Sequence, residues 1–133
     1  MCLDIKSSTR RQVADKDVVV YKLLITKYYV NNGLVYFTPY QNTRIEIGRT
    51  YQSRLCRNIY NNNRVDYGIH SFTSFSEAKR LVSKYYAKYE DSVVVRCIIP
   101  SGSYYYVGKF DVYNSIASNV LRYDKVLKRY SSN

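Results

Sequence analysis

The stretch VVVYKLLITKYYVNNGLVYF, residues 18–37, predicts the core of the fold. Residues 18–25 are rich in β-branched and apolar side chains, which is typical of a buried strand. Asn31, Asn32 and Gly33 form a turn signal, because Asn and Gly tolerate positive φ. Residues 34–37 follow as a second apolar run. We therefore expect the stretch to form a β-hairpin.

More strands are expected toward the C-terminus. Residues 92–99 form a β-branched run that stops at Pro100, which cannot donate to a strand ladder. Residues 100–103 indicate a turn, and residues 104–107 indicate a further strand that is closed by Gly108. Residues 119–129 fit either a helix or a last strand, and we favour the strand.

The clearest helix start is Ser74-Phe75-Ser76-Glu77, which matches a capping box. Apolar side chains recur after it at helical spacing and are expected to face the core: Ala78, Leu81, Val82, Tyr85 and Tyr89. Arg80, Lys84 and Lys88 are spaced by four and predict a basic stripe on the opposite side. Together with the strands, this predicts an α+β fold, a mostly antiparallel sheet with one main helix at about residues 75–89.

The length of the chain indicates how many domains it forms, and its charge indicates which kind of partner it binds. The 133 residues are expected to form a single domain, 1–133, with a basic N-terminal arm at residues 1–16. The chain carries 21 Lys and Arg against 10 Asp and Glu, a formal charge of +11. Such an excess predicts an anionic partner, either nucleic acid or an acidic protein or ribonucleoprotein surface.

Several classes of location and site are excluded by composition. No apolar run approaches the length needed to cross a bilayer, so we expect no membrane partner. The start of the chain lacks the apolar stretch of a secretory signal, and the three Cys show no C-x-x-C spacing. We therefore expect a reducing cytoplasm, with neither a disulfide framework nor a metal site.

Signatures of common enzymes are absent. The chain has no P-loop, no G-x-G-x-x-G and no G-x-S-x-G motif, and its few acids are scattered. His70 is the only His, and its position before the capped helix indicates a structural, hydrogen-bonded side chain. We therefore expect no catalytic residue, no cofactor and no enzymatic activity.

The sequence feature that does indicate a function is the interleaving of Arg with Tyr. Aromatic rings stack on the bases of single-stranded nucleic acid, and Arg or Lys binds its phosphates. Residues 44–64 and the helix stripe are the main candidate contact surface, in which we single out Arg44, Arg49, Tyr51, Arg54, Arg57, Tyr60, Arg64, Arg80, Lys84 and Lys88. Lys125, Lys128 and Arg129 form a further candidate surface.

Residues 67–72 (YGIHSF), the Ser-Glu-Ala helix start and residues 95–110 and 115–118 together resemble small uncharacterised proteins of gut bacteriophages and their Bacteroidales hosts. The resemblance implies no particular activity. It implies a bacterial host cytoplasm, or a virion, as the setting. Such a setting favours an antagonist of host defence or a virion component over a metabolic enzyme.

A second, weaker resemblance is to ADP-ribosyltransferase-like domains. In that family a G-I-Y strand enters a helix rich in Ser and Ala, and Gly68-Ile69-His70 would occupy the strand, with His70 in place of the stacking Tyr. The chain has no second His for the family's ribose-binding position.

Three functional hypotheses follow. The leading one is a small basic binding protein of phage type that engages nucleic acid or a host complex containing it. A virion or assembly protein is the first alternative, and an ADP-ribosyltransferase-like nucleotide-binding enzyme is the second.

Overall fold

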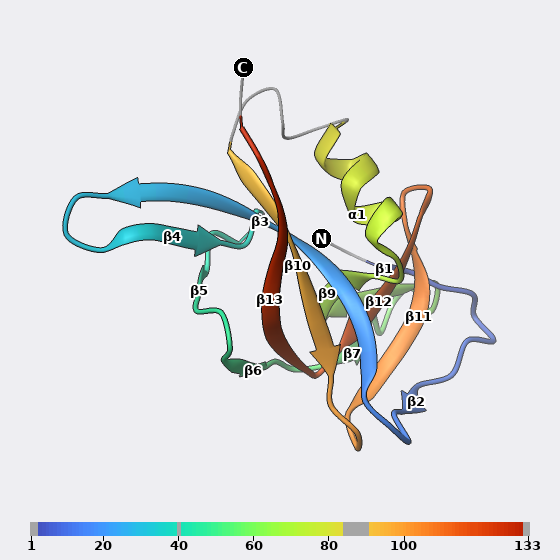
Figure 1. The fold of residues 1–133 in the computed structure, drawn as a ribbon. Helices are drawn as coiled ribbons and strands as arrows, with labels where there is room; N and C mark the ends of the chain where they lie inside the picture. The colour runs from blue at the N-terminus through green and yellow to red at the C-terminus, as the bar shows by residue number, and fades with distance from the viewer. Residues whose placement is uncertain (1–2, 40, 84–90, 132–133) are drawn as a thin grey trace.

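The computed structural model describes residues 3–39, 41–83 and 91–131. Within them the chain forms one helix and a single large antiparallel sheet (Figure 1). The strands are β1 (Leu3–Asp4), β2 (Gln12–Val13), β3 (Val18–Tyr29), β4 (Gly33–Phe37), β5 (Arg44–Ile45), β6 (Thr50–Gln52), β7 (Cys56–Arg57), β8 (Arg64–Tyr67), β9 (Ile69–Phe72), β10 (Ser92–Ile99), β11 (Tyr104–Phe110), β12 (Tyr113–Ser118) and β13 (Val120–Tyr130), and the helix is α1 (Phe75–Leu81).

The sheet is rolled, so that its first and last strands lie near each other. The strand order runs β6-β13-β10-β3-β9-β12-β11-β1-β8-β7, with β2 on β11 and the β4–β5 pair on β3. The outermost strands β6 and β7 are joined by residues 53–55 alone. A connection of that length spans at most about 14 Å. The chain therefore brings the two ends of the strand order together.

The central strands β3 and β10 are buried on both faces over most of the stretch in which they pair with each other. Val93, Val95 and Cys97 of β10 belong to a core cluster inside the roll, together with Val20 and Leu24 of β3. Val94 and Leu23 point the other way and pack with Ala78, Leu81 and Val82 at α1. This two-sided burial explains why both strands read as nearly continuous apolar runs.

The hairpin predicted for residues 18–37 is confirmed. β3 and β4 pair from Ile25↔Phe37 to Tyr29↔Gly33, and Gly33 adopts a positive φ of 69° at the turn. Figure 1 shows the tip of this hairpin projecting beyond the rest of the sheet. Tyr28 and Val30 near the tip are 76% and 93% exposed.

The predicted α+β class is wrong, because the described chain is mostly β. The start of the helix is as expected, since the Ser74 hydroxyl accepts a hydrogen bond from the Glu77 amide at 3.3 Å. The α-helix, however, is seven residues long, and residues 84–89 of the predicted helix lie outside the described residues. Residues 44–72, which carry little periodicity, contribute five short strands whose stability depends on tertiary pairing.

The strands expected in the last third of the chain are found. β10 spans residues 92–99 as predicted, and the ambiguous segment near residues 119–129 is strand β13. β11 does not close at Gly108 but continues to Phe110. A Cβ at Gly108 would lie 2.2 Å from the Asp4 carbonyl oxygen, so this glycine is needed because β1 passes directly against β11.

The described part of the predicted N-terminal arm contains paired and buried residues. Leu3 and Ile5 are 0% and 7% exposed and pack with Val65 and Ala117 in a separate small cluster. β1 lies between β11 and β8, and β2 pairs with β11. Lys6, Arg10 and Arg11 are therefore carried on a segment anchored at several points.

We predict that Gly108→Ala destabilises the protein by about 1–3 kcal/mol, because the new methyl group forces β1 away from β11. The measurement is the free energy of unfolding in urea. Val107→Ala is the control: its side chain is 40% exposed on the same strand, and we expect a much smaller change. Equal stabilities of the Gly108 variant and the parent would contradict the close approach of β1.

Candidate functional site

The predicted contact residues are divided among separate parts of the fold. Lys84 and Lys88 lie outside the described residues. Arg44 is exposed on β5, and Arg80 is exposed on α1 with its guanidinium 5.8 Å from the Tyr113 ring centroid. Lys125, Lys128 and Arg129 are exposed along β13.

Arg49 and Tyr51 form a local cluster at β6. The Arg49 guanidinium lies 3.6 Å from the Glu46 carboxylate and 5.7 Å from the Tyr51 ring centroid. The Tyr51 hydroxyl accepts a hydrogen bond from the Glu46 amide at 2.8 Å, and its ring packs edge-on against Tyr123. Tyr51 is therefore held in the fold by both its hydroxyl and its ring.

Arg57 ties the N-terminal segment to β7. Its guanidinium donates hydrogen bonds to the carbonyl oxygens of Ser7 and Thr9 and lies 5.4 Å from the Tyr106 ring centroid. The side chain is only partly exposed. Arg57 thus already serves the fold, and replacing it would disturb the packing of residues 7–9.

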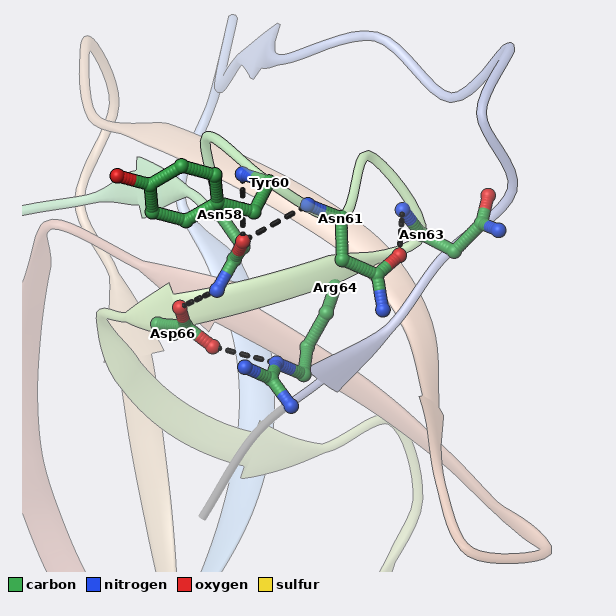
Figure 2. A network of polar contacts seen from close by, with 6 residues as sticks. All are labelled: Asn58, Tyr60, Asn61, Asn63, Arg64 and Asp66. Carbon is green, nitrogen blue, oxygen red and sulfur yellow. Dashed lines mark hydrogen bonds and ion pairs between the residues drawn. The ribbon is translucent and has the colours of Figure 1, made fainter.

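The β7–β8 loop is fixed by its own polar side chains (Figure 2). The Asn58 side-chain oxygen accepts hydrogen bonds from the amides of Tyr60 and Asn61, both at 2.8 Å. The Asn58 side-chain nitrogen donates to Asp66, which also accepts from Arg64 Nε at 2.7 Å. The loop is therefore ordered before any partner binds.

This ordered loop presents aromatic and apolar side chains to solvent. Tyr60 is 93% exposed and the preceding Ile59 is 80% exposed. At the other end of the hairpin, Tyr67 is 55% exposed and Arg54 lies over its ring, 5.0 Å from the centroid. The β7–β8 hairpin, residues 54–67, thus gathers Arg54, Arg57, Tyr60 and Arg64 of the predicted residues and adds Tyr67.

A second candidate site, around Lys22, was missed in the sequence. A pocket of about 210 Å³ opens between β3, β9 and the β4–β6 segment, and it is lined by Lys22 and His70 among others. Lys22 is 9% exposed, and its ammonium donates to the His70 carbonyl oxygen at 2.5 Å. The available signal was a charged residue in the middle of the apolar run at residues 18–25, since lysine is seldom buried.

The two polar groups of this pocket are strongly affected by burial. Burial lowers the pKa of the Lys22 ammonium to about 8. Burial, followed by the charge of Lys22, lowers the pKa of His70 to about 3, so that its ring is neutral at physiological pH. The expected hydrogen bonding of the His70 side chain is found in part: the ring hydrogen-bonds with the Gly68 backbone, whereas its Nε2 has no hydrogen-bond partner in the described part of the chain.

We predict that His70 makes the protein less stable as the solution is acidified. The unfolded state binds a proton near pH 6.5 and the folded state only near pH 3, so stability is complete above about pH 6.5 and falls below it. The loss at pH 5 is expected to reach about 2 kcal/mol. Urea unfolding from pH 7.5 to 5 measures it.

The matched variant is His70→Gln, which keeps a polar side chain and the main-chain carbonyl that Lys22 contacts. Between pH 7.5 and 5, the stability of this variant is expected to fall much less than that of the parent protein, because carboxylates contribute little in this range. A decline of the same size in both proteins would show that another group is responsible.

The described residues contain neither a membrane-spanning helix nor a cluster of metal-binding side chains. None of their helices has the length and apolar character to cross a membrane. Their His, Cys, Asp and Glu side chains nowhere come together in a group of three suited to a metal ion.

Comparison with known proteins gives no relative on which to base a function. An assignment for this chain depends on the geometry of the β7–β8 hairpin and of the Lys22 pocket. No protein-family model, curated protein or solved structure matches the chain.

Proposed function

We propose that this protein is a binding protein for single-stranded nucleic acid and that the β7–β8 hairpin is its contact surface. The observation that carries the proposal is the Tyr60 ring, 93% exposed at the tip of a loop whose backbone is held by Asn58. A net charge of +11 supplies the attraction for a polyanion.

The exposed rings favour a single strand over a duplex. A ring that stands free of its own protein can stack on a base only where the base is unpaired. Tyr60 has no ring contact among the described residues, and Tyr67 offers a second ring with Arg54 above it. An aromatic side chain on a fixed loop also loses less conformational freedom on binding than one on a mobile loop.

The arginines of the hairpin differ in how available they are to bind a phosphate. Arg64 is neutralised by Asp66, and Arg57 is engaged with the main chain of Ser7 and Thr9. Arg54 is exposed, and its contact with Tyr67 leaves the guanidinium edge available to a phosphate. We therefore assign the main phosphate contact of the hairpin to Arg54.

We predict that Tyr60→Ala weakens binding to a short single-stranded DNA or RNA about tenfold, because base stacking contributes about 1–3 kcal/mol per base. Fluorescence anisotropy with single-stranded and duplex probes measures the change. Tyr28→Ala is the control, since Tyr28 is also exposed but lies on the β3–β4 hairpin. Unchanged affinity of the Tyr60 variant would remove the loop from the proposal.

We predict that Arg54→Gln lowers the slope of log affinity against log salt by about 0.7, the value for one phosphate of a single strand. The same salt titration with Arg44→Gln is the control. Arg44 is exposed on β5, so this substitution removes an equal charge from a different part of the surface. Equal slopes for the two variants would indicate a diffuse charge effect and contradict a specific contact at Arg54.

A further inference from the structure

The pocket beside Lys22 has a buried apolar floor and a polar mouth. Leu23, Phe72 and Tyr123 line it and are almost completely buried, whereas Gln41 and Ser53 line it from exposed positions. An apolar cavity of about 150 Å³ is enough to accept benzene. A volume of about 210 Å³ therefore suits a ring or short chain with one or two polar substituents.

Lys22 supplies the pocket with an unbalanced positive charge. Neither Asp nor Glu is among the described residues that line it, and Lys22 is their one charged side chain at neutral pH. The titratable neighbours do not compensate: burial raises the pKa of the Cys97 thiol to about 12, and burial also raises the pKa of Tyr123. Tyr51 and His70, whose ring is neutral, are the other titratable groups among the described residues that line the pocket.

The hydrogen-bonding capacity of this site is also incomplete. An ammonium has three N–H donors, and the His70 carbonyl takes one of them. His70 is 8% exposed, and the Nε2 atom of its ring has no hydrogen-bond partner among the described residues. A neutral imidazole nitrogen either donates or accepts one hydrogen bond, and a hydroxyl group satisfies both cases.

We propose that this pocket binds a small organic carboxylate with an apolar or aromatic body and a hydroxyl group. The carboxylate accepts hydrogen bonds from the Lys22 ammonium and balances its charge. The hydroxyl pairs with His70 Nε2, and the body of the molecule packs on Leu23, Phe72 and Tyr123. This site is independent of the β7–β8 hairpin, and nucleic-acid binding is not required for it.

The test uses the full chain with benzoate, the three hydroxybenzoate isomers, benzamide and inorganic phosphate as probes. Calorimetric titration and thermal unfolding are expected to show saturable binding of benzoate, at least about tenfold tighter than benzamide, and tighter binding of one hydroxybenzoate isomer. Binding of benzoate is expected to weaken about tenfold from pH 7 to pH 9, as Lys22 loses its proton. Amide chemical shifts in β3 and β9 locate the bound probe.

Lys22→Met removes the ammonium and keeps an unbranched side chain that is one atom shorter, and we expect it to weaken benzoate binding at least about tenfold. Lys27→Met is the matched control on the same strand, because Lys27 is exposed and does not line the pocket. If Lys22→Met does not fold, the benzoate–benzamide difference and the pH dependence of the parent protein still decide.

The remaining outcomes each overturn part or all of the proposal. Equal binding of benzamide and benzoate would show that charge is irrelevant. Equal binding of phosphate would show that the apolar body is irrelevant, and equal binding of all isomers and benzoate would remove the hydroxyl contact to His70. Absence of binding by every probe would overturn the proposal altogether.

Discussion

β3 and β10 pair along eight register positions, from Ile99↔Val18 to Ser92↔Ile25, and both faces of this pair are buried. Each face of the β3–β10 pair must therefore be shielded from water by another part of the chain. The sheet rolls over one face and closes through residues 53–55, and α1 covers part of the other with Ala78 and Leu81. The apolar surface removed from water by this arrangement is the main favourable contribution to folding.

The same burial creates the Lys22 pocket. Lys22 lies within the central strand, so its ammonium is removed from water along with its apolar neighbours. β9 pairs with β3 at Tyr21↔Phe72, and beyond that point the Lys22 side chain reaches the His70 carbonyl. An ammonium that is held there with one polar partner has a positive charge and N–H donors with which it can bind an anion.

Much of the positive charge is placed against aromatic rings of the protein itself. Arg11 lies 4.3 Å from the Tyr104 ring centroid, and Arg54 and Arg57 lie over Tyr67 and Tyr106. Such contacts are worth about 0.5–1 kcal/mol each at exposed sites. They show how a chain with a net charge of +11 uses several of its Tyr in folding, whereas Tyr60 has no such contact among the described residues and is 93% exposed.

Local signals in the sequence were sufficient for the β3–β4 hairpin, the Ser74 cap and strand β10, because turn residues, capping side chains and β-branched runs act over a few neighbouring residues. For β13 they favoured a strand but left a helix open. They did not determine the class of the fold or the short strands between residues 44 and 67. These strands have two to four residues each, too few for a periodic pattern, and β6 and β8 pair with β13 and β1, which are distant in the chain. The sequence alone also grouped Arg57 and Arg64 with the other candidate contact residues. Tertiary structure engaged them with the main chain and with Asp66, left Tyr60 exposed and buried Lys22, because hydrogen bonding and burial depend on which strands meet in space.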